Sequence, residues 1–127
     1  MAFVEMPRWG QKKSGRVNHE RLVANGIEFD SKAEHDRYLE LLVMERAGVI
    51  SELECHPRYE IIPKQVVPGH RAFLPAHYTA DFRYLDKNGN QVVEDVKSSY
   101  TREDQAYILR RKLMWMVNGI YVEEVVR

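Results

Sequence analysis

The chain has 127 residues, a length suited to one domain built around a single hydrophobic core. Hydrophobic residues make up 44% and charged residues 30%, which are globular proportions that exclude wholesale disorder. The 19 Lys and Arg residues balance 19 Asp and Glu residues. Because net charge averages over a whole surface, this balance neither indicates nor excludes a nucleic-acid partner.

The single cysteine, Cys55, excludes an intrachain disulfide, and nothing indicates an oxidising compartment. No segment approaches the ~18 apolar residues of a membrane span. The first residues lack the apolar run of a signal peptide. We therefore expect a cytoplasmic protein with no membrane partner.

Residues 1–24 show no sustained hydrophobic period and carry prolines and glycines. We interpret them as a basic, partly flexible N-terminal arm that precedes a domain over residues 25–127. Its cations are candidates for salt-dependent contacts with nucleic-acid phosphates. They are Lys12, Lys13, Arg16 and Arg21.

A first helix is predicted from Ser31, which can cap it, to Ala47, just before the stop residue Gly48. Residues 26–29 precede it as a short extended piece, and a strand is predicted over 58–62. Three prolines and a glycine then predict a loop up to residue 75. The apolar positions with helical spacing are Ala33, Leu39, Leu42, Val43 and Ala47.

Two strands, residues 77–85 and 91–98, flank the turn signal Asn88-Gly89 and predict a hairpin. A second helix is predicted from Thr101 to Gly119, with Thr101 and Asp104 forming a variant capping box. A last strand begins at residue 120. The order helix, three strands, helix, strand indicates an α/β sandwich with mixed pairing. The helix's apolar face would be Ala106, Leu109, Leu113, Met116 and Val117.

The hairpin carries the residues with the most chemical interest. Asp95 and Lys97 are two apart on one strand and therefore share a face. A two-residue turn would pair Asp81 with Val96 and place it beside Glu94. A three-residue turn over residues 87–89 would pair Asp81 with Asp95, and Gly89 suits the left-handed position that such a turn requires.

Two carboxylates directly opposite one another repel unless a cation compensates. Mg²⁺ or Mn²⁺ would do so, because these ions prefer oxygen ligands. Lys97, on the same face, could then hold or activate a metal-bound water near a phosphate. The alternative is an exposed hairpin face with an ordinary charge pair.

The pattern Asp81, then Asp95-Val96-Lys97, resembles the PD-(D/E)XK motif of the nuclease superfamily that includes restriction enzymes and phage junction resolvases. Segments 26–34, 78–82 and 93–97 more closely resemble a phage-encoded family of the endonuclease-I-like branch. The similarity runs from about residue 25 to the C-terminus. One departure is Ala80, where the motif has proline.

The resemblance implies a single restriction-endonuclease-like α/β (α+β) domain with an αβββαβ core, its mixed sheet flanked by helices. It implies an Mg²⁺- or Mn²⁺-dependent DNA endonuclease, hydrolysing phosphodiester bonds of double-stranded or branched DNA as a homodimer. Asp81, Asp95, Glu34 and the Val96 carbonyl would bind the metal, and Lys97 would position the attacking water. The alternative function is a nucleic-acid-binding or phage assembly protein that keeps the fold without cutting.

Glu34 has a competing role, because Ser31-x-x-Glu34 also reads as a capping box. Ser98 and Thr101 follow Lys97 closely and are candidates for phosphate contact, although Thr101 can also serve only as a helix cap. If phage-encoded, the protein would act in the cytoplasm of the host cell.

Overall fold

The computed structural model describes residues 22–127, and the chain divides into two compact units, residues 1–37 and 38–127. In the first unit, β2 (Leu22–Ala24) and β3 (Ile27–Phe29) form an antiparallel hairpin. Its turn is Asn25-Gly26, with φ of 52° and 77°, as a two-residue hairpin turn requires. The extended piece before the helix is confirmed. Strand β2 consists of residues that the sequence assigns to the end of the basic arm. The cations of that arm lie outside the described residues; they are Lys12, Lys13, Arg16 and Arg21.

Helix α2 (Lys32–Arg46) begins and ends where the sequence predicts. The Ser31 Oγ accepts the Glu34 backbone N–H at 3.1 Å, and Gly48 follows in the left-handed region with φ of 79°. Its buried side chains are Tyr38 and Leu41, whereas the predicted apolar positions Leu39 and Val43 are exposed. The predicted face of this helix was therefore wrong.

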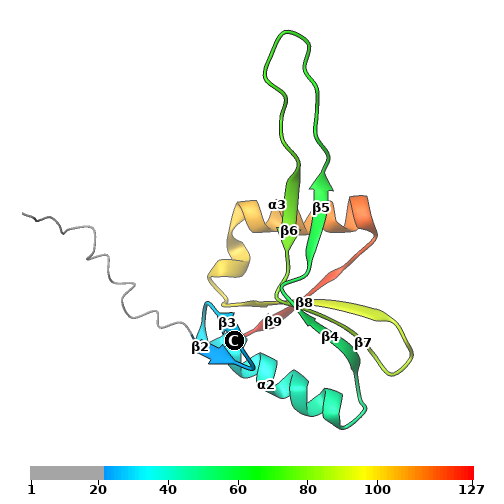
Figure 1. Ribbon diagram of the computed structural model, residues 1–127. Helices are drawn as coiled ribbons and strands as arrows, with labels where there is room; N and C mark the ends of the chain where they lie inside the picture. The colour runs from blue at the N-terminus through cyan, green and yellow to red at the C-terminus, as the bar shows by residue number, and fades with distance from the viewer. Residues whose placement is uncertain (1–21) are drawn as a thin grey trace, which may run out of the picture. The chain divides into compact units, whose positions relative to one another are not determined.

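The central sheet has the order β4-β7-β8-β9, formed by β4 (Ser51–Cys55), β7 (Phe82–Leu85), β8 (Gln91–Lys97) and β9 (Val122–Val126). Strands β8 and β9 are parallel, and the other neighbours are antiparallel. The fold is thus α+β with a mixed sheet (Figure 1). Strand β4 was not predicted, because this short edge strand has a register shift and only two apolar residues, Leu53 and Cys55.

Strands β5 (Arg58–Ile62) and β6 (Ala76–Thr79) pair with each other, outside the central sheet. The predicted single strand over 77–85 is therefore interrupted between β6 and β7. At this bend Ala80 donates its N–H to the Pro57 carbonyl at 3.0 Å, and His56 donates to the Asp81 carbonyl at 2.9 Å. The interruption arises because β6 pairs with β5, whereas β7 pairs with β4 and β8.

Helix α3 (Gln105–Asn118) follows a short 3₁₀ turn, η2 (Thr101–Glu103). Its cap is Asp104, whose side chain accepts the Tyr107 N–H at 2.9 Å, so the prediction of Thr101 as helix cap was wrong. Gly119 ends the helix with φ of 68°, as predicted. No helix in residues 22–127 is long and apolar enough to span a membrane.

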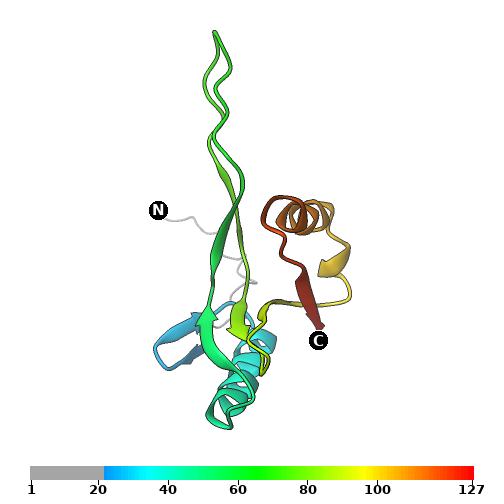
Figure 2. The same cartoon turned by 90° about the vertical axis from the view of Figure 1, so that its right-hand side faces the viewer.

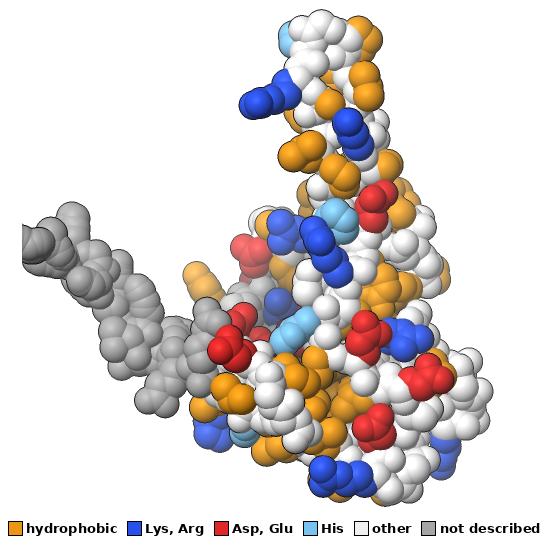
Figure 3. All heavy atoms as spheres, in the orientation of Figure 1, with side chains coloured by type: hydrophobic (Ala, Val, Ile, Leu, Met, Phe, Trp, Pro, Cys, Tyr) orange, Lys and Arg blue, Asp and Glu red, His pale blue; other side chains and the backbone are white. Residues whose placement is uncertain are grey.

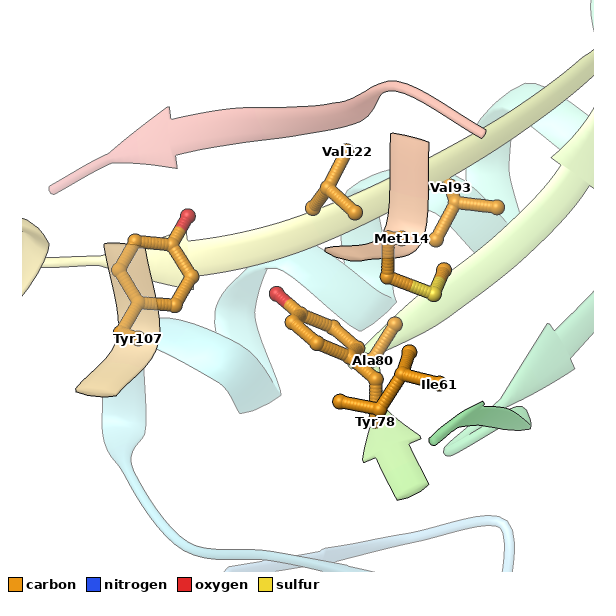
Figure 4. Close-up of a cluster of buried hydrophobic side chains, with 7 residues drawn as sticks. All are labelled: Ile61, Tyr78, Ala80, Val93, Tyr107, Met114 and Val122. Atoms are coloured by element: carbon orange, nitrogen blue, oxygen red, sulfur yellow. The ribbon is translucent and has the colours of Figure 1, made fainter. Parts of the chain in front are cut away.

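Helix α3 packs beside β5 and β6, and its buried residues Tyr107 and Met114 join the main core cluster (Figures 1 and 4). The predicted apolar positions Leu109, Met116 and Val117 are instead exposed. The core therefore lies between α3 and the face of the sheet that carries Val93. The cluster consists of Ile61, Tyr78, Ala80, Val93, Tyr107, Met114 and Val122.

Candidate active site

The turn between β7 and β8 decides whether the acidic residues of the hairpin meet. The Asp86 N–H donates to the Asn90 carbonyl at 2.9 Å, and the Gly89 N–H donates to the Asp86 carbonyl at 2.9 Å. Gly89 has a φ of 83°, the left-handed conformation expected at the end of a three-residue turn. The Asp86 carboxylate also accepts the Asn88 and Asn90 N–H groups. The three-residue turn over 87–89 is confirmed.

This register places Asp81 level with Asp95, just beyond the last paired residues Phe82 and Glu94. The Asp81 N–H lies 2.9 Å from the Asp95 Oδ1 and 3.1 Å from the Glu94 carbonyl oxygen. The Val96 N–H in turn donates to the Asp81 Oδ2 at 2.7 Å. Each of the two aspartates thus accepts a backbone N–H at the bend, and the structure brings both carboxylates together.

Asp95 is almost fully buried, with 3% of its surface exposed. Its Oδ2 accepts a hydrogen bond from the hydroxyl of Tyr78, which is also buried. Burial raises the pKa of the Asp95 carboxyl above its ordinary value, although the Tyr78 hydroxyl and the nearby Lys97 charge act in the opposite direction. Burial and the Asp95 charge likewise raise the pKa of Tyr78, so its hydroxyl remains a donor.

Lys97 lies two residues beyond Asp95 on β8, and its Nζ stands 4.4 Å from the centroid of the Tyr107 ring. The Tyr107 hydroxyl donates to Glu124 at 2.7 Å, and Glu124 is the residue paired with Asp95 on β9. The lysine is therefore held against an aromatic face by a cation–π contact. A pocket of about 410 Å³ opens beside it, lined by Lys97, Tyr100, Thr101, Glu103, Asp104 and Tyr107.

Glu124 accepts the hydrogen bond that holds Tyr107 in place, and its side chain is only 9% exposed. Arg102 donates to its Oε1 at 2.9 Å, and Arg111 lies 3.7 Å from its Oε2. Although its burial acts in the opposite direction, the Tyr107 hydroxyl and the two arginines hold the pKa of Glu124 below its ordinary value. Glu124 is therefore an ionised anchor for Tyr107.

The backbone of Val96 lies next to the Asp81 carboxylate. In an extended strand the N–H and C=O of one residue point toward the same neighbouring strand. Because the Val96 N–H reaches the Asp81 side chain, its carbonyl faces the side on which Asp81 lies. The opposite face of β8 carries Glu94, which is buried and accepts the Tyr84 hydroxyl, and which is therefore not part of the Asp81–Asp95 pair.

Glu34, Ser98 and Thr101 are the remaining predicted site residues. Glu34 belongs to the first turn of α2, in the unit formed by residues 1–37. Ser98 and Thr101 bind each other: the backbone N–H of each residue donates to the side-chain oxygen of the other at 2.9 Å. Both hydroxyls thus stabilise the turn that leads into η2, and their contact with phosphate stays a prediction.

Tyr78, Tyr107 and Glu124 belong to this site but were not predicted from the sequence. Strict alternation places Tyr78 on the opposite face from Asp81, and only the bend at Ala80 brings it to Asp95. Glu124 could have been found from its place in β9, the strand parallel to β8. Tyr107 had no local signal, because its role depends on how α3 packs.

The described residues hold no group of three or more His, Cys, Asp or Glu side chains arranged to bind a metal. Neither the curated proteins nor the solved structures contain a match to this chain. A family model does match residues 14–123, most of the sequence. The chain with this interlocked Asp81–Asp95 pair therefore belongs to the family described as "Protein of unknown function (DUF1064)".

Proposed function

We propose that the protein is a metal-dependent DNA endonuclease with a restriction-endonuclease-like domain. The observation that carries the proposal is the hairpin register, which aligns Asp81 with Asp95. Lys97 lies on the same strand face as Asp95, two residues further along β8. This is the arrangement that the resemblance to PD-(D/E)XK nucleases requires of these three residues.

The available donor atoms fit Mg²⁺ or Mn²⁺. The Asp81 and Asp95 carboxylates and the Val96 carbonyl are all oxygen donors. Mg²⁺ commonly binds proteins through one or two carboxylates and completes its shell with water and substrate phosphate. A carboxylate offers about four acceptor positions. Each Asp95 oxygen accepts one hydrogen bond in the described contacts, so each keeps capacity for a further ligand.

When bound, the metal would polarise the scissile phosphate and lower the pKa of a bound water. The residues of the chain position the other participants. Tyr78 holds the orientation of Asp95, and the Val96 N–H holds that of Asp81. Lys97, braced by Tyr107, would orient the attacking water and neutralise charge on the phosphate. The role of Glu34 as an additional acidic ligand stays a prediction of the resemblance alone.

The proposed substrate is double-stranded DNA, with branched structures such as four-way junctions as the first choice. The proposed active form is a homodimer, for which the exposed apolar side chains Leu109, Met116 and Val117 of α3 provide available surface. The competing function is DNA binding or phage assembly without cleavage. That reading predicts binding without turnover, although both aspartates and the lysine are present.

A cleavage panel tests the proposal. Supercoiled, linear and four-way-junction DNA are incubated with Mg²⁺, Mn²⁺ or EDTA, using the wild-type chain and Lys97→Ala. Lys87→Ala is the matched control, because Lys87 is an exposed lysine of the same hairpin, in the turn itself. We expect cleavage that needs the metal, persists in Lys87→Ala and is lost in Lys97→Ala. Binding without cleavage under every condition would favour the competing function, and equal cleavage by Lys97→Ala would remove Lys97 from the mechanism.

A further inference from the structure

The hairpin of β5 and β6 projects far beyond the other elements of the unit formed by residues 38–127, as Figures 1 and 2 both show. We name residues 63–75, between the two strands, the distal arm. Gln65 and Phe73 exchange both backbone hydrogen bonds across it, at 3.0 and 2.9 Å. The tip is a turn closed by His70 N–H on the Val67 carbonyl, with Gly69 at a φ of 79°. The distal arm is therefore a two-sided ribbon, joined by one isolated bridge and closed by a turn at its tip.

The charge of this ribbon has one sign. No Asp or Glu occurs from Ile61 to Ala80, whereas Lys64 and Arg71 are both exposed. In Figure 3 the outer part of the ribbon shows blue and orange side chains and no red ones on the face in view. In a sequence that is neutral as a whole, this segment carries two cations and no acidic residue, and this local excess of positive charge favours a polyanionic partner.

Large apolar side chains accompany the cations. Val66, Phe73 and Leu74 are 78%, 66% and 77% exposed. A two-stranded ribbon without a covering helix or sheet has no core in which to bury them. Exposed apolar groups next to cations mark an interaction surface. In proteins that bind the DNA minor groove, such side chains insert between base steps while Lys and Arg contact the backbone.

The prolines of the distal arm disfavour a second copy of the chain as the occupant. Pro63, Pro68 and Pro75 carry no backbone N–H, so they interrupt the donors that edge-to-edge strand pairing needs. Lys64 and Arg71 would also repel their counterparts in a second ribbon. The prolines restrict the chain before binding, which lowers the entropy cost of engaging a rigid partner.

We propose that the distal arm is a DNA-binding element, with Lys64 and Arg71 on backbone phosphates and Phe73 and Leu74 against the bases in a groove. This inference rests on the proposed function, since it takes the same DNA as ligand. It adds a contact remote from Asp81 and Asp95 that supplies affinity but no chemistry.

The test measures binding in EDTA, where cleavage is absent. Fluorescence anisotropy with a labelled duplex and a labelled four-way junction is recorded at several salt concentrations. The variant Lys64→Gln/Arg71→Gln is compared with Arg46→Gln/Lys87→Gln, which removes the same charges from exposed sites outside the arm. Losing two phosphate contacts should make the negative slope of log K against log salt less steep by about 1.8, and the control should keep the wild-type slope.

A second variant, Phe73→Ser/Leu74→Ser, should weaken binding at every salt concentration while leaving the slope unchanged. Thermal unfolding and light scattering accompany each protein. Wild-type slope and affinity in both arm variants would overturn the inference, while cleavage by the wild type would leave the proposed function intact. Weakened binding that occurs only together with loss of a dimer would assign the arm to contact between copies instead. Absence of DNA binding and of cleavage by the wild type would overturn both.

Discussion

Replacing Tyr78 by Phe removes one oxygen atom, the donor to the buried Asp95 carboxylate. A hydrogen bond to a charged group contributes ~2 kcal/mol to stability, and the carboxylate left behind is 3% exposed, so water cannot replace the lost donor. We expect the midpoint of thermal unfolding in EDTA to fall by about 8 °C in a chain of this length. Because the Asp95 carboxylate also loses its orientation, metal-dependent cleavage should fall about tenfold, or ~1.4 kcal/mol.

Tyr84→Phe provides the matched control. Tyr84 is also buried, and its hydroxyl donates to a buried carboxylate of the same strand, that of Glu94. The two variants should lose similar stability, but only Tyr78→Phe should show the tenfold fall in cleavage. We also expect Mn²⁺ to raise the unfolding temperature of the wild type and of Tyr84→Phe, and to raise that of Tyr78→Phe less. Equal cleavage by the two variants, measured well below both unfolding temperatures, would refute the reasoning that Tyr78 orients Asp95 for the metal.

Three further predictions follow from other contacts. Tyr107→Leu removes the ring beneath Lys97 and should slow cleavage severalfold at saturating DNA, whereas Tyr107→Phe keeps the ring and should retain most of the rate. Burial and the charges of Asp81 and Glu54 raise the pKa of the Cys55 thiol to about 11, from its ordinary value of 9.0. Iodoacetamide should therefore label Cys55 at pH 8 far more slowly in the native chain than in the unfolded chain. Between pH 9 and pH 11 the folded state keeps a thiol proton that the unfolded state loses, so the free energy of unfolding measured in urea should fall over this range. The fall should be smaller in Cys55→Ala, which has no thiol. Gly89→Ala forces a side chain into the left-handed region and should cost about 1 kcal/mol in urea unfolding, whereas Gly89→Asn should cost less; an equal loss would place the cost elsewhere.

The helix limits could be predicted because short-range chemistry determines them. Ser31 accepts an N–H of the first turn of α2, and glycines follow both helices in the left-handed conformation. The same local logic fails at Thr101, because its hydroxyl is already engaged with Ser98, and Asp104 takes the cap of α3.

The buried faces of the helices could not be read from apolar spacing. Leu39 and Val43 on α2, and Leu109 and Met116 on α3, keep the expected period but point to solvent. Both helices carry apolar residues on more than one face, so the period alone does not select which face meets the sheet. Packing selects Tyr38 and Leu41 in α2, and Tyr107 and Met114 in α3.

The candidate site divides in the same way. Gly89 and the alternation along β8 were sufficient to predict that a three-residue turn would pair Asp81 with Asp95, because turn length and strand period are local properties. The structure selected this turn over the two-residue alternative. The bend at Ala80 exists only because the two halves of that predicted strand pair with different partners. That bend brings Tyr78 to Asp95 and directs β5 and β6 away from the central sheet. The sequence by itself thus determined the two helices, the turn between β7 and β8 and the position of the acidic residues on that hairpin. Tertiary pairing decided what supports the acidic pair and that residues 63–75 form a projecting arm, because long-range strand pairing leaves no local signal.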